Sequence, residues 1–286
     1  MEVTSKVAEL QGKIKGWKQK GLRVGFVPTM GYLHEGHLSL VREAKRRNDR
    51  TAISIFVNPK QFGPAEDYNV YPRDFKRDVA LLEKEGVDLI FYPGVEEMYP
   101  AGYKTYVEVE DLENKLCGRS RPGHFRGVCT VVLKLFNLIQ PDEAYFGWKD
   151  AQQVIILKKM VEDLNLPVKI RPMPLIREED GLALSSRNIY LNQQERQAAL
   201  VLYRSLDLAE KMIKNGEREA ARIRQQMVNL ISAEPLARID YVEIVDLQTL
   251  EPLTTIEGDA LVAVAVYFGR TRLIDNLRFI SGVVEK

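Results

Sequence analysis

The sequence predicts an α/β protein, in which a doubly wound parallel sheet precedes a smaller α+β domain. Apolar, β-rich runs alternate with helical patterns over most of the first 170 residues. Several of these runs are apolar throughout, which is typical of parallel strands that are buried on both faces. From about residue 192 the pattern changes to helices followed by three strands. We therefore expect one domain over residues 1–175 and a second over 176–286, with the boundary within residues 174–190.

The predicted elements follow in order along the chain. In the first domain we expect helices at 5–20, 37–47, 74–86, 124–139 and 150–163, and strands at 22–27, 51–57, 87–91, 143–146 and 168–170. In the second domain we expect helices at 192–214 and 217–231, and strands at 239–246, 260–267 and 271–277. Ligands of a doubly wound sheet bind beyond the carboxyl ends of its strands, so the polar segments at these ends are the candidate site.

Two of the three histidines of the chain, His34 and His37, follow the first predicted strand and flank Gly36. A strand, a glycine turn and a helix start direct free backbone N–H groups at one point, where a phosphate can bind. A zinc site is improbable because few further ligands are available, and a His-Glu-x-x-His site requires a spacing of four residues. Two histidines that only cap a turn remain the alternative.

Four further polar segments lie at strand ends or face them. Gln61 follows the second strand, Lys149 and Gln153 follow the strand at 143–146, and Ser185, Ser186 and Arg187 lie in a short polar loop. Three arginines, at 119, 121 and 126, surround His124 and suit a carboxylate or phosphate. The alternatives are an exposed loop for Gln61, surface ion pairs for the arginines and a domain linker for the serine loop.

Composition excludes several functional classes. The net charge is +1 without a long basic block, so we expect no nucleic-acid partner. The N-terminal residues contain no apolar signal core and no run approaches the length of a membrane span, which predicts a cytoplasmic protein without a membrane partner. Cys117 and Cys129 could form a disulfide, but two free thiols are expected in a reducing compartment.

These segments together resemble the pantoate–β-alanine ligase (pantothenate synthetase) family, within the nucleotidylyltransferase superfamily that shares the His-x-Gly-His motif. The likeness extends over nearly the full length, and seven motifs occur in the family's order: Pro28-Thr29-Met30-Gly31, His34-x-Gly-His37, Phe56-Val57-Asn58-Pro59-x-Gln61-Phe62, Tyr71-Pro72-Arg73, Arg121-Pro122-Gly123-His124-Phe125-Arg126-Gly127, Phe146-Gly147-x-Lys149-Asp150-x-Gln152-Gln153 and Ser185-Ser186-Arg187-Asn188. Trp148 departs from the family, which often carries a polar residue there.

The resemblance implies a Rossmann-type first domain, a smaller C-terminal lid domain that closes over it, a homodimer, and ATP with Mg²⁺. It implies that (R)-pantoate and β-alanine condense to pantothenate, AMP and pyrophosphate through a pantoyl adenylate. It assigns catalysis to His34, His37, Lys149 and Arg187, pantoate to Gln61 and Gln153, β-alanine to Gln61, and a magnesium-side carboxylate to Asp78. The ATP contacts that it implies are Met30, Gly31, Tyr32, Leu33, His34, Glu35, Gly36, His37, Gly147, Trp148, Lys149, Asp150, Ile176, Leu184, Ser185, Ser186 and Arg187.

Two other functions compete with this interpretation. A nucleotidylyltransferase that transfers AMP to a phosphate-bearing acceptor would need a basic acceptor pocket, where this chain has the neutral Gln61 and Gln153. A nucleotide sensor or RNA-binding module would keep the ATP motifs without an acid pocket, and the lack of a basic stripe disfavours it. The residues favour a hydroxylated carboxylic acid as the substrate, because amides bind it without adding another like charge.

Overall fold

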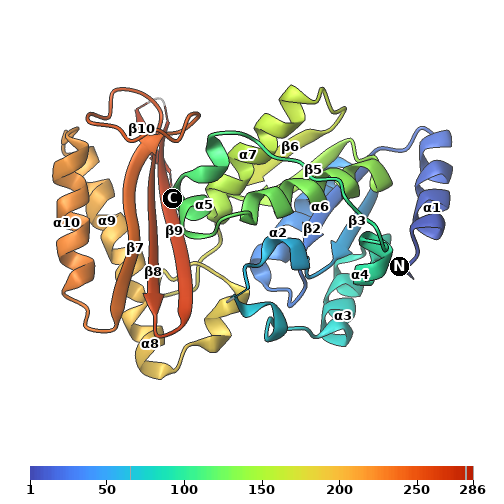
Figure 1. Cartoon of the computed structure of the whole chain (residues 1–286), viewed down its shortest axis with the longest axis horizontal. Helices are drawn as coiled ribbons and strands as arrows, with labels where there is room; N and C mark the ends of the chain where they lie inside the picture. Colours follow the sequence, from blue (N-terminus) through green and yellow to red (C-terminus); the bar gives the residue numbers. More distant parts are fainter. Residues whose placement is uncertain (65, 281, 286) are drawn as a thin grey trace.

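The computed structural model describes residues 1–64, 66–280 and 282–285, and the chain forms two lobes (Figure 1). The N-terminal lobe holds a six-stranded sheet flanked by helices. Its strands are β1 (Glu2–Thr4), β2 (Val24–Thr29), β3 (Arg50–Ile55), β4 (Leu89–Phe91), β5 (Glu143–Gly147) and β6 (Lys169–Met173). Its helices are α1 (Val7–Gln19), α2 (Glu35–Arg47), α3 (Phe75–Glu85), α4 (Val95–Met98), α5 (Leu116–Ser120), α6 (His124–Ile139) and α7 (Ala151–Asp163).

The six strands are all parallel and run in the order β1-β4-β3-β2-β5-β6. The chain builds the sheet outward from β2 through β3 to β4, and then returns to the other side of β2 with β5 and β6. The register aligns Thr29 with Ile55, and Gly147 with Met173, so the ends of these strands lie along one edge. The strand order reverses between β2 and β5, which is where a doubly wound sheet binds its ligand. The prediction of a parallel, doubly wound sheet is therefore confirmed, and the strand ends named as the candidate site lie along this edge.

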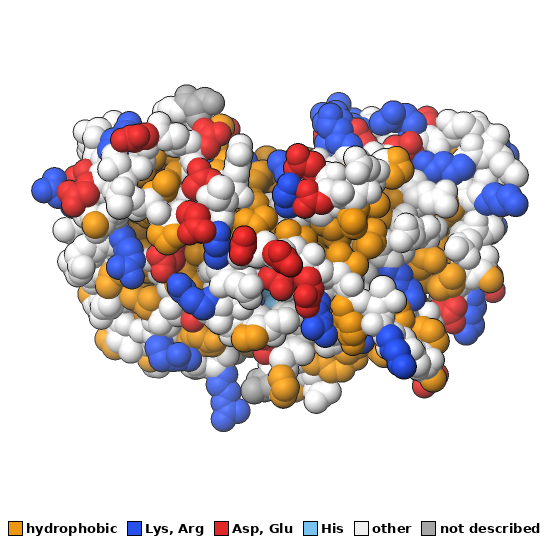
Figure 2. Space-filling view, turned by 45° about the horizontal axis from the view of Figure 1, so that its top comes forward, with side chains coloured by type: hydrophobic (Ala, Val, Ile, Leu, Met, Phe, Trp, Pro, Cys, Tyr) orange, Lys and Arg blue, Asp and Glu red, His pale blue; other side chains and the backbone are white. Residues whose placement is uncertain are grey.

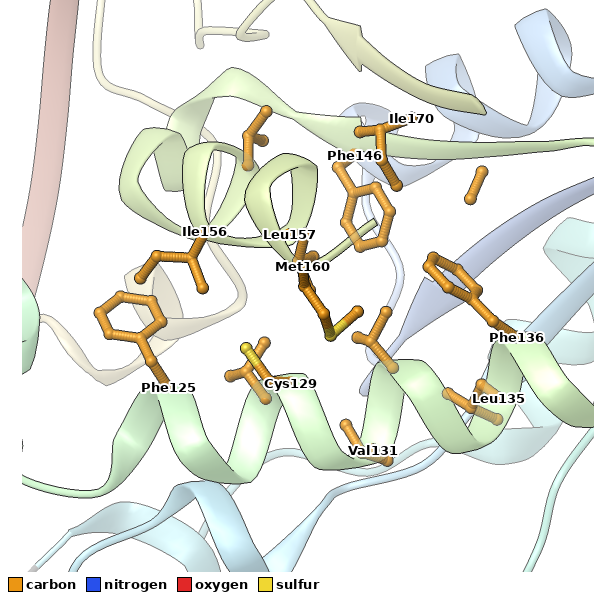
Figure 3. Packing of buried hydrophobic residues seen from close by; sticks show 14 of the residues in the cluster. Phe125, Cys129, Val131, Leu135, Phe136, Phe146, Ile156, Leu157, Met160 and Ile170 are labelled. Carbon is orange, nitrogen blue, oxygen red and sulfur yellow. The ribbon is translucent and has the colours of Figure 1, made fainter. Parts of the chain in front are cut away.

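Helices cover both faces of this sheet because each presents an apolar stripe to it. On one face α2 and α3 pack with the strands, and this cluster includes Val41 and Leu82. On the other face α6 lies against α7, and Figure 3 shows side chains of the two helices facing one another across the layer. Cys129 of α6 points into this layer towards Met160 of α7. Close packing of this kind fixes where the N-terminal ends of α6 and α7 lie, and both ends border the site described below.

The C-terminal lobe consists of helices packed on a four-stranded antiparallel sheet. Its elements are α8 (Gln193–Ala198), α9 (Leu200–Lys214), α10 (Ala220–Ser232), β7 (Ala237–Asp246), β8 (Ala260–Phe268), β9 (Thr271–Ile280) and β10 (Val283–Glu285), and the sheet order is β10-β9-β8-β7. One face of the sheet packs on α9 and α10. Tyr241, Leu261 and Ala263 belong instead to the same buried cluster as α6 and α7. The apolar core therefore continues from one lobe into the other.

Two details differ from the sequence-based expectations. The helix expected over 192–214 is divided at Ala199 into α8 and α9, and no Gly or Pro marks this break in the sequence. The short elements β1, α4, α5 and β10 were not predicted. The predicted boundary at residues 175 and 176 falls just after β6 and stays a prediction. Cys117 and Cys129 are buried free thiols, and no helix among the described residues is long and apolar enough to cross a membrane.

Candidate active site

A cavity of about 220 Å³ lies at the carboxyl ends of β2, β3, β5 and β6. Figure 2 shows the surface hollowed between the two lobes. The cavity brings together residues from seven separate segments of the described chain. Those predicted from the sequence are Met30, His34, Gly36, His37, Gln61, Gly147, Lys149, Asp150, Gln153, Ile176, Leu184, Ser185, Ser186 and Arg187. Residues that the motifs named independently therefore line one space, whereas their contacts with substrates stay a prediction.

The two histidines lie together at the first turn of α2, which begins one residue after His34. Their ring centroids are 4.0 Å apart, and the backbone N–H of His34 donates to Nδ1 of His37 at 3.3 Å. A Cβ atom on Gly36 would lie 2.9 Å from Cε1 of His34, closer than non-bonded carbons approach. Glycine between the histidines therefore leaves room for the ring of His34. The hydrogen bond from the His34 N–H to the His37 ring is itself a helix-capping contact, so the capped-turn alternative stays open.

Both histidines are neutral at pH 7. Burial, together with the nearby Lys149 ammonium, lowers the pKa of His34 to about 4. Burial and the neighbouring His34 hold the pKa of His37 well below its ordinary value. Because Nδ1 of His37 accepts a backbone N–H, its proton resides on Nε2, which remains a donor. Nδ1 of His34 is buried without a hydrogen-bond partner among the described residues, as expected of a group that awaits a ligand.

Gln61 is held by Asn58 rather than exposed in a free loop. Asn58 Nδ2 donates to Oε1 of Gln61 at 3.0 Å and to the carbonyl of Gly127 at 3.0 Å. A Cβ atom on Gly127 would lie 2.2 Å from the carbonyl oxygen of Lys60, so only glycine lets α6 approach this closely. Since Oε1 is already engaged, Nε2 of Gln61, 3.3 Å from Sδ of Met30, is the amide end that remains for a ligand. The exposed-loop alternative is thereby set aside.

Lys149 and Arg187 bring cations to the cavity from two different segments. The Lys149 ammonium lies 3.8 Å from Oδ1 of Asp150, just before α7 begins. Arg187 donates from Nε and Nη2 to the carboxylate of Asp67 at 2.8 Å each. The hydroxyl of Ser186 donates to the carbonyl of Tyr32 at 3.2 Å, which ties the serine loop to the loop after β2. The loop is therefore part of the site and is more than a linker.

Asp78 supports the loop between β2 and α2 (residues 30–34) by binding its backbone. Its two carboxylate oxygens accept the backbone N–H groups of Tyr32 and Leu33 at 2.8 Å each. Burial raises the pKa of this carboxyl, against the lowering effect of the two N–H donors. Asp78 lines a separate pocket beside Tyr68 and Tyr92 rather than the cavity. The sequence assigned Asp78 to magnesium, whereas in the structure both of its carboxylate oxygens already accept backbone hydrogen bonds.

Four other residues predicted to contact ATP do not place their side chains in the cavity. Leu33 is fully buried in the core, Glu35 pairs with Arg42 on the surface, and the Trp148 ring lies 4.3 Å below the guanidinium of Arg278. Tyr32 has a positive φ of 51°, next to Gly31 at 84°, so this pair turns the chain tightly between β2 and α2. Their contacts with ATP stay a prediction.

The arginine cluster is occupied by ion pairs, as the alternative interpretation held. Arg119 pairs with Glu243, Arg121 with Glu66, and Arg126 with Glu108. Arg121 and His124 of this cluster nevertheless line the cavity, and so do Asn58 and Tyr71, which the sequence analysis did not single out. Nδ1 of His124 lies 2.8 Å from the carbonyl of Gln61, so it carries the proton, and Nε2 accepts from Arg121. Asn58, Tyr71, Arg121 and His124 all belong to the quoted family motifs, and this was the signal that could have placed them at the cavity.

The donor set fits a magnesium ion that arrives with the nucleotide better than a resident metal. Among the described residues, no group of three His, Cys, Asp or Glu side chains is placed to hold a metal ion. Mg²⁺ bound to ATP typically takes one or two protein carboxylates and completes its shell with phosphates and water. Asp150 is the predicted ATP contact that offers a half-exposed carboxylate to the cavity, next to Lys149.

Comparison with known proteins identifies the family. The pattern of the family described as pantoate-beta-alanine ligase matches residues 2–278. Pantothenate synthetases from Caldicellulosiruptor saccharolyticus and Pelotomaculum thermopropionicum are 58% and 59% identical, covering 97% and 96% of this chain and 99% and 98% of theirs. The crystal structure of pantothenate synthetase from Thermus thermophilus superposes with a TM-score of 0.91 at 50% identity, over 97% of this chain and 99% of that one.

A second crystal structure is that of pantoate-beta-alanine ligase from Francisella tularensis, complexed with beta-gamma ATP and beta-alanine. It has a TM-score of 0.80 and 34% identity, covering 96% of this chain and 97% of that one. These likenesses extend over both lobes, and they agree with the motifs and with the cavity that the motifs line. The chain therefore belongs to the pantoate–β-alanine ligase family.

Proposed function

We propose that this chain joins (R)-pantoate to β-alanine at the cavity described above, with cleavage of ATP to AMP and pyrophosphate. The observation that carries the proposal is that two neutral histidines, two cations and the amides of Gln61 and Gln153 line one cavity. Cationic and N–H donors suit a triphosphate, whereas amides suit a hydroxylated acid. Membership of the family supports the same pair of substrates.

In the first step the pantoate carboxylate attacks the α-phosphate of ATP, and pyrophosphate leaves. No protein nucleophile is needed, because the substrate supplies one. The Nε2–H of His37, with His34, Lys149 and Arg187, would donate to the phosphates as their charge redistributes. Arg187 has further N–H donors on Nη1 while Nε and Nη2 hold Asp67. These four residues accordingly hold and orient the leaving group.

The nucleotide would lie along the strand ends between the two lobes. The proposed contacts are those of segments 30–37 and 147–150, Ile176, and segment 184–187. Mg²⁺ bound to the phosphates would neutralise their charge, and Asp150 is the carboxylate that we assign to it. Asp78 would act through the backbone of Tyr32 and Leu33, as its hydrogen bonds support.

In the second step the amine of β-alanine attacks the acyl carbon of the adenylate, and AMP leaves. Gln61 and Gln153 would hold the hydroxyls and the acyl group of pantoate, and Gln61 would also contact β-alanine. An acyl adenylate hydrolyses where water enters, so the C-terminal lobe would act as a lid that excludes it. The core that continues between the lobes supports a lid that stays packed on the N-terminal lobe during both steps.

The alternative, transfer of AMP to a phosphate-bearing acceptor, would need free cations on the acid side of the cavity. There Arg121 is paired with Glu66, and His124 is held neutral by burial beside Arg121. The neutral amides of Gln61 and Gln153, which line the cavity, support the ligase over this alternative. The lack of a basic stripe in the sequence disfavours a nucleotide-sensing module that binds RNA.

The test is exchange of labelled pyrophosphate into ATP. With pantoate and magnesium but without β-alanine, we expect exchange, because the triphosphate and acid sites are complete before the amine binds. A transferase would require a phosphate-bearing acceptor instead. Exchange that occurs only when β-alanine is present would exclude the two-step mechanism.

We further propose that the protein is a cytoplasmic homodimer. ATP as a cosubstrate and two buried free thiols support a cytoplasmic location. The homodimer rests on the family resemblance, and sedimentation equilibrium tests it directly: a single species at the mass of one chain would exclude it.

A further inference from the structure

Asn276 of β9 reaches from the C-terminal sheet to the backbone beside Lys149. Its Nδ2 donates to the carbonyl oxygen of Trp148 at 2.9 Å and to that of Lys149 at 3.1 Å. The residue is only 6% exposed, so water does not compete freely for these carbonyls. Two positions before it, Ile274 also faces the N-terminal lobe, where it packs against the shared core. Asn276 thus makes a polar contact across the seam between the lobes, next to the apolar contact of Ile274.

The two carbonyls belong to the peptide units on either side of the Lys149 Cα atom. An amide NH₂ group has two N–H donors, and here each one is used on a successive carbonyl. Fixing both peptide planes fixes the φ and ψ angles of Lys149, and with them the direction in which its side chain leaves the backbone. This segment directly precedes α7 and borders the cavity, so the hydrogen bonds act on a side chain that faces the site.

Asn276 is itself held in place by its neighbour. The backbone N–H of Asn276 donates to Oδ1 of Asp275 at 2.8 Å. Asp275 in turn receives two hydrogen bonds from Arg177, at 2.6 and 3.0 Å, and Arg177 also donates to the carbonyl of Gly181. The buried Asp275–Arg177 pair therefore anchors the turn over residues 177–183, in which Arg177 bridges to Ala183. This turn leads to the loop of Ser185, Ser186 and Arg187. Two consecutive residues of β9 secure both of the segments that bring cations to the cavity.

We propose that Asn276 is a positioning residue for adenylate formation, setting the Lys149 ammonium beside the phosphates from the opposite lobe. The inference rests on the proposed function, because Lys149 has its role there. It assigns to the C-terminal sheet a part in the first chemical step, beyond covering the site. Asn276 acts only through the backbone of the Lys149 turn, so its effect should vanish once the Lys149 side chain is gone.

The test is a double-mutant cycle with N276A, K149A and the combined variant, read by pyrophosphate exchange. We expect N276A to lower kcat about tenfold, with a smaller change in the KM for pantoate, because a misdirected ammonium affects the transition state. K149A should lower kcat on the order of a hundredfold or more. The combined variant should be no more than about twofold slower than K149A, because coupled residues are not additive.

Controls separate positioning from general stability. N229A makes the same substitution on the exposed side of α10 and should leave kcat and the thermal midpoint unchanged. I274A removes apolar packing from the same seam, and it should lower the midpoint without the coupling to Lys149. If N276A fails to fold, N276S replaces it in the cycle, since its shorter side chain cannot span both carbonyls.

The outcomes distinguish this inference from the proposed function. Activity of K149A close to that of the unmodified protein would contradict the proposed site itself. A strongly impaired K149A together with an N276A that retains kcat within about twofold would overturn the inference alone. Losses that multiply in the combined variant would also overturn it, because Asn276 would then act independently of Lys149.

Discussion

Replacing Asp78 with asparagine should loosen the loop between β2 and α2 (residues 30–34) without changing the magnesium requirement. The carboxylate accepts two backbone N–H groups at 2.8 Å, from Tyr32 and Leu33. Asparagine keeps one acceptor but turns its other end into an NH₂ group that faces an N–H donor. A hydrogen bond to a charged acceptor contributes roughly 1.5–3 kcal/mol, and relief from burying a charge offsets part of its loss. We expect a net loss of about 2 kcal/mol, which for a chain of 286 residues lowers the thermal midpoint by about 3 °C.

The assay combines calorimetric unfolding with titration of ATP and of magnesium. D74N is the matched control: it makes the same change at the N-cap of the same helix, where asparagine caps as well as aspartate. We expect D78N to lower the midpoint and weaken ATP binding, and D74N to do neither. An unchanged midpoint, combined with a magnesium requirement raised tenfold or more, would show that Asp78 is a metal ligand and refute this reasoning.

Further predictions concern the histidines and the amides. H37A should lower kcat on the order of a hundredfold with little change in the pantoate KM, as steady-state kinetics would show; near-normal turnover of the folded variant would contradict the assignment. Q61A and Q153A should each weaken pantoate use by about 1–3 kcal/mol while calorimetric ATP affinity stays intact, and the reverse pattern would mean that the acid pocket is misplaced. G36A should displace the His34 ring and lower kcat, and a crystal structure with the ring unmoved would exclude this cause. The pKa of His34 is lowered to about 4 in the folded chain, so between about pH 6.5 and pH 4 this histidine binds a proton in the unfolded chain but not in the folded one. Stability should fall as the pH drops from 6.5 towards 4, less steeply in H34Q, and equal slopes in unfolding titrations would contradict the burial argument.

The sheet was predictable because its strands are buried on both faces. A strand such as β2 reads as an apolar run, and the regular alternation with helices gave the parallel order. The strand β1, by contrast, has only three residues and includes Glu2 and Thr4, so it gives no apolar signal. The division at Ala199 has no signal either, because alanine suits a continuous helix. Short or polar elements depend on tertiary contacts that no local pattern contains.

The candidate site was predictable as a set of residues but not as a geometry. Motifs named His37, Gln61 and Lys149, and the switch in strand order explains why they meet. They could not indicate that Asp78 binds the backbone, since a carboxylate beside a metal and one beside two N–H groups look the same in sequence. Asn276 could not be predicted from the sequence for a similar reason. Its partners are two backbone carbonyls, which every residue type has.

The strand order also constrains how the protein can be made. β2 leaves the ribosome long before β5, its neighbour at the switch point, which pairs Glu143 with Gly25. Until then one edge of β2 is unpaired, and an unpaired edge in a nascent chain invites association with other chains. Lys149, Arg187 and Asn276 are synthesised later still. The cavity lining therefore cannot be complete before Arg187 has been synthesised, and the hydrogen bonds from Asn276 to the Lys149 turn form later still.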